Sequence, residues 1–333
     1  MTCQCRKYRY AKVLANAHMQ IVFATLAFAR RRIRGLALYY MADQDIKKAI
    51  IPIAGMGTRF LPLSLAVSKE FFPLVDKPII QYIIEEVKKS GINEIIFVVN
   101  PRQKMILSYL KKSPELEKLL IHRKKDKQLQ ELKDFEAMLD GLSFSFVTQN
   151  APHGDGHALL QAARFVGEAP VAVSFGDDIV DGDEPALLQL MTMFKTCNAP
   201  VIALKSLPKD KIPAYGSVAV EKIANHLYKI KKIVEKPDPK DIQSNLVIVG
   251  KSILTPEVFD YLKQAKPSEK GEIILGEVFE KMLSEGKTIY GYELKGEWLE
   301  CGDKEKWLKS FLYLALKDER FGKELREFVK QIK

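Results

Sequence analysis

The chain has 333 residues, of which 47% are hydrophobic and 28% charged, and its net charge is +10. These proportions are typical of an ordinary folded protein and exclude a disordered or fibrous one. A charge of +10 raises the question of a nucleic acid or an anionic membrane as partner. However, positions 1–40 hold eight arginine and lysine residues and no acidic residue, which leaves only +2 for the rest of the chain. We therefore expect no nucleic-acid and no membrane partner.

The first forty residues differ from the rest of the sequence. Residues 21–29 form an apolar run, but this run is far shorter than the roughly 20 residues that span a bilayer. The arginines at 30–32, directly behind it, oppose export. With only four cysteines, the chain is typical of a reducing compartment, and we expect a cytoplasmic protein. We interpret residues 1–40 as a basic N-terminal extension that need not be native, Met41 as an alternative start, and residues 41–333 as a single domain.

From residue 48 on, apolar runs of strand length alternate with segments whose apolar residues recur at helical spacing. We expect strands at 48–53, 94–99, 144–149, 171–175 and 201–204, and helices at 79–89, 157–166 and 184–197. Strands that are apolar on both faces and separated by helices are typical of a parallel sheet covered on both sides. We therefore predict an α/β fold with a doubly wound, mixed and mostly parallel sheet. Ligands of such sheets bind beyond the carboxyl ends of the strands.

Two regions depart from this alternation. Residues 116–139 are rich in lysine, glutamate and leucine, and we predict an amphipathic helix or helix pair inserted into the sheet order. Its charges are more typical of a solvated face than of a binding surface. Residues 217–223 and 229–234 are expected to form a strand meander. After a strand at 245–250, we expect the chain to be mainly helical.

The first strand leads into a glycine-rich segment, followed by a lysine. Small residues directly after a buried strand let backbone amides approach a phosphate or a base closely, and Arg59 and Lys69 add cationic donors. A glycine turn alone would be weak evidence. The candidate nucleotide-binding residues of this segment are Ala54, Gly55, Gly57 and Thr58.

The whole stretch 54–82, AGMGTRFLPLSLAVSKEFFPLVDKPIIQY, resembles the signature loop of the nucleotidylyltransferases that make nucleotide sugars. It is not a Walker loop, because no Gly-Lys-Ser/Thr follows. The chain is most similar to the bacterial uridylyltransferase branch of this family, over roughly residues 46–311 and including the insertion at 116–139. The resemblance implies a Rossmann-like nucleotide-diphospho-sugar transferase fold with C-terminal helices. It also implies UTP and glucose 1-phosphate as substrates, Mg²⁺ as cofactor and a homo-oligomer, dimer or tetramer.

The same resemblance assigns roles to further residues. Gln149 and the backbone of Gly154 would read the pyrimidine base, and Asp177 would hold Mg²⁺ together with Glu300, while the role of Asp178 stays open. Lys236 would neutralise the attacking phosphate, and Glu235 would accept hydrogen bonds from sugar hydroxyls. The implied sugar-binding residues are Gly216, Glu235, Lys236 and Asn245. The implied catalytic residues are Arg59, Lys69, Asp177 and Lys236.

The chain also departs from the family pattern. Ser64-Leu65 stands where Thr-Lys is usual, and residues 64–69 are more similar to the thymidylyltransferase branch. Asp155 replaces an apolar residue of a Gly-Leu-Gly-His pattern, and Ile274-Leu275-Gly276 replaces Gln-Leu-Thr. Glu300 stands in place of the Asp of Asp-Cys-Gly, so that its carboxylate has a longer stem.

Three alternatives stay open. The first is the same chemistry with dTTP or with another sugar 1-phosphate. The second is a catalytically inactive module that serves as a sensor or an assembly subunit, and the retention of Lys69, Asp177 and Lys236 argues against it. The third is an RNA-binding protein, which rests on the basic residues 1–40 alone.

Overall fold

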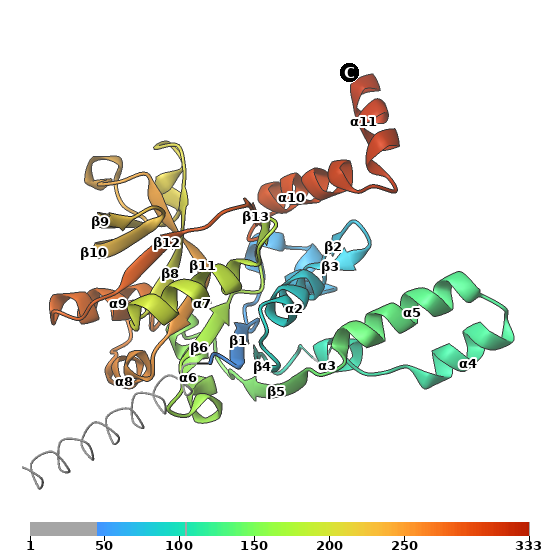
Figure 1. The fold of residues 1–333 in the computed structure, drawn as a ribbon, viewed down its shortest axis with the longest axis horizontal. Helices are drawn as coiled ribbons and strands as arrows, with labels where there is room; N and C mark the ends of the chain where they lie inside the picture. Colours follow the sequence, from blue (N-terminus) through green and yellow to red (C-terminus); the bar gives the residue numbers. More distant parts are fainter. Residues whose placement is uncertain (1–44, 104, 333) are drawn as a thin grey trace, which may run out of the picture. The chain divides into compact units, whose positions relative to one another are not determined.

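The computed structural model describes residues 45–103 and 105–332, and its centre is a nine-stranded sheet (Figure 1). The strand order is β5-β4-β1-β6-β11-β8-β12-β10-β9. The strands are β1 (Lys48–Pro52), β4 (Glu94–Val99), β5 (Ser143–Thr148), β6 (Val171–Ser174), β8 (Val201–Ser206), β9 (Gly216–Ala224), β10 (Leu227–Glu235), β11 (Leu246–Leu254) and β12 (Tyr290–Glu293). Strands β11 and β10 pair antiparallel with their neighbours, and the other seven run in one direction. The sheet is thus mixed and mostly parallel in direction, as the sequence predicts.

Helices cover both faces of this sheet. They are α2 (Ile79–Lys89), α3 (Met105–Tyr109), α4 (Pro114–His122), α5 (Asp126–Leu139), α6 (Asp155–Val166), α7 (Ala186–Cys197), α8 (Pro256–Gln264), α9 (Leu275–Ser284), α10 (Lys304–Lys317) and α11 (Gly322–Gln331). The first strand shows why two layers form. Ala49 and Ile51 face a core that contains the apolar sides of α2 and α7, and Ile50 faces a second core with α6, α8 and α9. All three residues are fully buried, which explains the continuous apolar run of this strand.

The segment 116–139 is a helix pair, as predicted. Helices α4 and α5 lie side by side and project from the sheet beside β5 (Figure 1). Helix α4 buries none of its residues. Near its C-terminal end α5 is held to the body by Phe135, whose ring packs 4.9 Å from that of Tyr109, and by Lys88, which donates to the carbonyl of Met138 (2.8 Å).

The expectation of mainly helical structure after residue 250 is wrong in part. Strand β11 extends to Leu254, β12 enters the main sheet between β8 and β10, and β13 (Glu297–Glu300) pairs with β7 (Asp178–Asp181). Strands β12 and β13 have four residues each, which is too short to establish an alternating pattern in sequence. Both segments become strands because they pair with other strands, β12 with β8 and β10, and β13 with β7. A further short hairpin, β2 (Pro73–Leu74) and β3 (Lys77–Pro78), precedes α2.

The strand order defines where a ligand can bind. From β1 the chain moves to β4 and β5 on one side and then returns to β6 on the other side of β1. Such a reversal opens a crevice at the carboxyl ends of the two central strands, where open α/β sheets bind their ligands. The glycine-rich segment follows β1, and Asp177 follows β6.

Within the described part of the chain, residues 46–103 and 105–332 form one compact unit. The interpretation of residues 1–40 as an extension lies outside the described residues. Within 45–103 and 105–332, no helix combines the length and the apolar character needed to cross a membrane.

Candidate active site

The glycine-rich segment presents its backbone at the surface. Strand β1 ends at Pro52, the next residue, Ile53, is buried, and a 3-10 turn, Thr58–Phe60, follows Gly57. Phe60 anchors this turn, because its buried ring packs edge-on against Phe72 with the ring centroids 4.8 Å apart. Gly55, Thr58 and Arg59 remain exposed. A fixed turn with exposed amides and one cation can receive a polyphosphate.

The end of β6 approaches this segment closely. A Cβ added to Gly176 would lie 2.7 Å from the Ile53 side chain, so only glycine permits the approach. The next residue, Asp177, accepts a hydrogen bond from Lys69 Nζ. Although burial raises the pKa of Asp177, the charges of Lys69 and Arg59 outweigh it and lower this pKa overall. The pair thus presents a permanent carboxylate and a permanent cation at the crevice.

Glu300 joins the same place from the other end of the chain. Strand β13 aligns Glu300 with Asp178, and the Cys301 amide donates to the Asp177 carbonyl (2.7 Å). The environment of Gly302 reveals how close the side chains come. A Cβ at Gly302 would have Glu300 Oε1, Asp177 Oδ2 and Arg59 Nη1 within 3.2, 3.5 and 3.7 Å. The structure therefore brings Arg59, Asp177 and Glu300 together around one point.

Tyr215 and Lys306 hold the Glu300 carboxylate. The Tyr215 hydroxyl donates to Oε2 (2.5 Å), and Lys306 Nζ donates to Oε1 (2.7 Å). Lys306 also lies 4.5 Å from the centre of the Tyr215 ring. Glu300 is thus neutralised and oriented by two side chains whose contacts the sequence analysis did not predict.

The donor set fits Mg²⁺ that is bound together with a polyphosphate. Among the described residues, no group of three or more His, Cys, Asp and Glu side chains could hold a metal ion. Mg²⁺ commonly takes one or two carboxylates and completes its octahedral shell with phosphate oxygens and water. Asp177 and Glu300 would supply these two carboxylates.

Asp178 has a different environment from its neighbour. Trp298 Nε1 donates to Oδ1 (2.7 Å), and the Gly250 amide donates to Oδ2 (3.2 Å). Burial, followed by the charge of Asp177, raises the pKa of Asp178 to about 7. Both of its oxygens thus tie β7 to β13 and β11, and we assign Asp178 a structural role.

Three of the four predicted sugar-site residues, Gly216, Glu235 and Lys236, lie around Tyr215. Gly216 and Glu235 are register partners on β9 and β10, and a Cβ on Gly216 would lie 2.9 Å from Glu235 Oε2. The Lys236 amide donates to the Tyr215 carbonyl (3.0 Å). Because Tyr215 also contacts Glu300, one residue links this turn to the carboxylates. Asn245 is directed elsewhere, since its side-chain amide donates to Ser206 Oγ (2.5 Å).

The predicted base-reading residues lie together beyond β5. Gln149 is buried, and its Nε2 donates to the Gly154 carbonyl (3.0 Å) and lies 3.0 Å from His157 Nδ1. Gly154 has φ +92°, and a Cβ there would lie 2.4 Å from the Ile273 carbonyl. The loop therefore requires glycine at this position and packs against Ile273.

Sequence reasoning missed Lys306, the Tyr215 hydroxyl and Glu70. Glu70 is buried directly beside Lys69, and Gln103 Nε2 donates to it (3.4 Å). Lys306 follows the Glu300 motif by six residues in the first turn of α10, and this proximity is the only signal the sequence offers. The position of Glu70 next to Lys69 is also a signal. However, Glu70 matters because it is buried, and the sequence does not show this burial.

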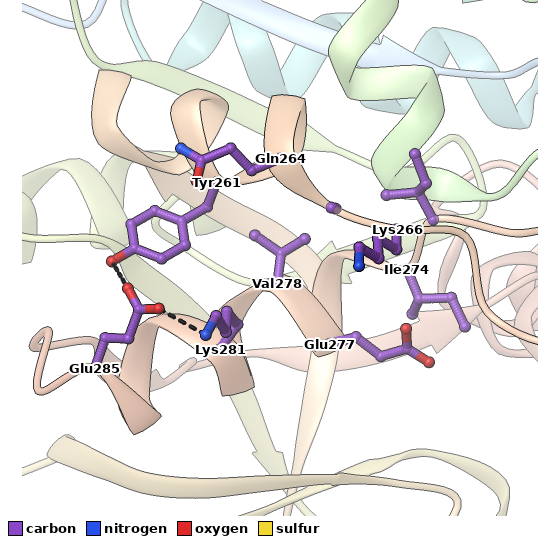
Figure 2. A pocket seen from close by; sticks show the side chains of 10 residues that line it. Tyr261, Gln264, Lys266, Ile274, Glu277, Val278, Lys281 and Glu285 are labelled. Carbon is purple, nitrogen blue, oxygen red and sulfur yellow. Dashed lines mark hydrogen bonds and ion pairs between the residues drawn. The ribbon is translucent and has the colours of Figure 1, made fainter.

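A cavity of about 440 Å³ lies between α8 and α9 (Figure 2). Tyr261 donates to Glu285 (2.6 Å) at one end of it, and Lys281 pairs with the same carboxylate (2.7 Å). None of the predicted site residues lines this cavity. Its wall includes Ile273 and Ile274, the segment against which the Gly154 loop packs.

Comparisons with known proteins identify the family of the chain. The sequence profile of the nucleotidyl transferase family matches residues 48–316, which include all the residues of the site. The chain belongs to this family.

Individual relatives are matched over nearly their whole length. A UTP–glucose-1-phosphate uridylyltransferase of Staphylococcus saprophyticus is 40% identical over 287 residues, which cover 86% of this chain and 99% of the relative. The UTP-bound UGPase of Acinetobacter baumannii superimposes with a TM-score of 0.79 at 32% identity, over 86% of this chain and 100% of that one. A UDP-glucose pyrophosphorylase solved with UDP-glucose superimposes with a TM-score of 0.73 at 31% identity. The superposition covers 82% of this chain and 100% of that one.

Proposed function

We propose that this chain transfers a uridylyl group from UTP to glucose 1-phosphate, giving UDP-glucose and pyrophosphate. The observation that carries the proposal is the convergence of Arg59, Asp177 and Glu300 beside the glycine-rich segment, at the point where the strand order reverses. This chain covers 99% and 100% of the length of two relatives, and the names of these relatives support the proposed substrates.

The side chains would act by positioning and by charge. In the proposed reaction the backbone of residues 54–58 holds the triphosphate, while Arg59 and Lys69 face the α-phosphate and the departing pyrophosphate. Attack by the ionised phosphate oxygen of glucose 1-phosphate needs no general base. Preorganised cations beside a phosphorus centre account for most of the catalysis in phosphoryl-type transfers.

The second substrate would be held from the opposite side. Glu235 accepts hydrogen bonds from glucose hydroxyls, and Lys236 neutralises the attacking phosphate. Asp177 and Glu300 would hold Mg²⁺, which when bound supplies charge neutralisation and a common template for the phosphate oxygens. Gln149 and the Gly154 backbone would read the uracil edge.

A dTTP-dependent activity is the second candidate. Leu65 stands where the uridylyltransferase branch usually has lysine, and its side chain is exposed, so no cation is offered at that point. We further propose that residues 41–333 are the enzymatic domain and that the protein acts in the cytoplasm as a dimer or tetramer.

One assay distinguishes these candidates. Pyrophosphate release is measured with UTP, dTTP, ATP and GTP, each against several sugar 1-phosphates. We expect the highest kcat/KM for UTP with glucose 1-phosphate. A preference for dTTP of about tenfold or more, equal to about 1.4 kcal/mol in the transition state, would assign the chain to the other branch.

A further inference from the structure

Two departures from the family pattern meet in space. Asp155 stands where the pattern has an apolar residue, and Leu275 belongs to the segment that replaces Gln-Leu-Thr. They are 120 residues apart, yet the Leu275 amide donates to Asp155 Oδ1 at 2.9 Å. The same oxygen accepts from the Gly156 amide at 2.7 Å.

One carboxylate therefore serves the N-termini of two helices. Asp155 is the first residue of α6, and Leu275 is the first residue of α9. Neither helix receives a side-chain cap from its own N-cap residue, Gly154 or Ile274. The amides at helix starts favour a negative charge, and Asp155 supplies a charged acceptor to the first turn of both helices.

The same contact fixes the loop that contains Gly154. The Ile273 amide donates to the His153 carbonyl (2.8 Å), and the Gly156 amide donates to the Ile273 carbonyl (2.9 Å). The three hydrogen bonds fasten residues 153–156 to residues 273–275. Gln149, whose amide contacts the Gly154 carbonyl, is held in turn.

Helix α9 continues this connection to the sugar side. Glu280 on α9 accepts a hydrogen bond from the Ile233 amide of β10, two residues before Glu235. The helix that Asp155 caps is thus bonded to the strand that carries the proposed sugar-binding carboxylate. The shorter path runs to the nucleotide side, where Asp155 directly follows Gly154.

We propose that Asp155 is a positioning residue for base recognition, which sets the distance between the Gly154 backbone and the Gln149 amide by fastening their loop to the N-terminus of α9. Burial raises the pKa of this carboxyl, and the amides of Leu275 and Gly156 oppose that rise. Burial of the Asp155 carboxylate costs free energy, and a leucine at this position would avoid that cost. Residues 274–276 are Ile, Leu and Gly, which have no side-chain acceptor to cap α9, and the Asp155 carboxylate supplies one.

The test compares Asp155→Leu with Asp155→Asn in the full chain. Leucine removes the acceptor, whereas the asparagine Oδ1 can accept from both amides. For Asp155→Leu we expect KM for UTP to rise about tenfold or more, because the Leu275 amide loses its acceptor and the Gly156 amide retains only the Ile273 carbonyl, with KM for glucose 1-phosphate and kcat changed far less. Asp155→Asn should stay close to the parent protein. Binding of UTP, measured by calorimetry without the second substrate, should show the same order.

Asp318 offers a matched control. Its Oδ1 also accepts hydrogen bonds from two backbone amides, those of Arg320 and Phe321, in the turn between α10 and α11. Asp318→Leu should leave KM for UTP unchanged. The proposal is overturned if Asp155→Leu binds UTP as the parent does, if it raises both KM values equally, or if Asp155→Asn fails as badly as leucine.

This inference rests on the proposed function, and the parent protein separates the two. If the parent does not turn over UTP with glucose 1-phosphate, the proposed function fails. If the parent is active and the nucleotide parameters of Asp155→Leu are unchanged, only the role of Asp155 fails.

Discussion

Lys69 and Lys236 carry the same charge but lie in different surroundings. Burial lowers the pKa of Lys69, yet Asp177 and Glu70 raise it overall, so this lysine stays charged where the α-phosphate would lie. Lys236 is exposed and follows Glu235 directly. The two side chains are therefore expected to act on different steps.

Lys69→Ala should lower kcat by about 10²-fold or more, because a preorganised cation acts on charge that develops in the transition state. Lys236→Ala should mainly raise KM for glucose 1-phosphate. Initial rates measured over both substrates separate the two effects. Lys77→Ala, which removes a lysine paired with Glu85 on α2, is the control. Equal effects of both variants on one substrate would refute the separate roles.

The metal prediction concerns the longer stem of Glu300. Asp177→Ala should lower kcat/KM by about 10³-fold or more, since it removes the carboxylate that pairs with Lys69 and that is proposed to hold the metal. Glu300→Ala should cost less and raise the Mg²⁺ concentration needed for half-maximal rate, while Glu300→Asp should retain activity. Glu297→Ala, on the same strand but exposed, should change nothing. An unchanged Mg²⁺ requirement in Glu300→Ala would make Glu300 a purely structural residue.

Glu70 gives a prediction for the dependence of stability on pH. Burial raises the pKa of Glu70 from 4.5 to about 7, although Lys69 lowers it. The folded chain holds this proton more tightly than the unfolded chain, so its contribution to stability is fully present below pH 4.5 and is lost as pH rises to about 7.

Glu70→Gln should remove this pH-dependent loss of stability, because glutamine does not ionise. Relative to the parent, the free energy of unfolding of Glu70→Gln should increase between pH 4.5 and pH 7, by on the order of 1–3 kcal/mol. Urea unfolding at several pH values measures this difference. The pKa of Asp178 is also raised to about 7, but Asp178 is present in both proteins, so its contribution cancels in the comparison. Parallel profiles of the two proteins would contradict the assigned burial effect.

At the scale of elements, one buried ion pair connects β6, the strand that leads to Asp177, with β11, α2 and α7. Lys251 on β11 has a fully buried side chain and pairs with Glu86 of α2 (2.9 Å). Lys251 also donates to Ser174 Oγ at the end of β6 (2.8 Å), and Glu86 accepts from the Leu187 amide of α7 (3.1 Å). Four elements thus share one pair of charges.

Breaking this pair on one side should be costly. Lys251→Met leaves a buried carboxylate without its cation and should lower the free energy of unfolding by about 3–5 kcal/mol. The double variant with Glu86→Gln should recover much of that loss. Chemical denaturation of both variants checks the prediction, and a double variant no more stable than Lys251→Met would show that packing, not charge, is lost.

The elements that the sequence predicts are those with long patterns. The β1 run, the glycine-rich segment and the helix pair at 116–139 are visible because local composition determines them. Strands β7, β12 and β13 are not, since four residues cannot establish a period and their partners lie far away in the chain. The motifs indicate Asp177 and Glu300, but the contacts of Tyr215 and Lys306 with Glu300 depend on the tertiary structure, because Tyr215 lies 85 residues before Glu300.

At the scale of the whole molecule, charge and site occupy different parts of the sequence. Positions 1–40 carry most of the net charge of +10, whereas the proposed site residues and Lys306 lie between 54 and 306. The family profile begins at residue 48, and the S. saprophyticus relative, aligned over 287 residues, is covered to 99% of its own length. The nine-stranded sheet begins at Lys48.

A chain that begins at Met41 is therefore expected to fold and to turn over UTP and glucose 1-phosphate with kcat and KM within about twofold of the full chain, a difference below about 0.5 kcal/mol. Its unfolding midpoint in urea should also match, because the sheet and the residues of the proposed site are retained. Removing the eight basic residues should abolish retention on a polyanion column at moderate salt, since +2 remains. Loss of activity or solubility in the shortened chain, with the parent active under the same conditions, would show that residues 1–40 are a functional part of the enzyme.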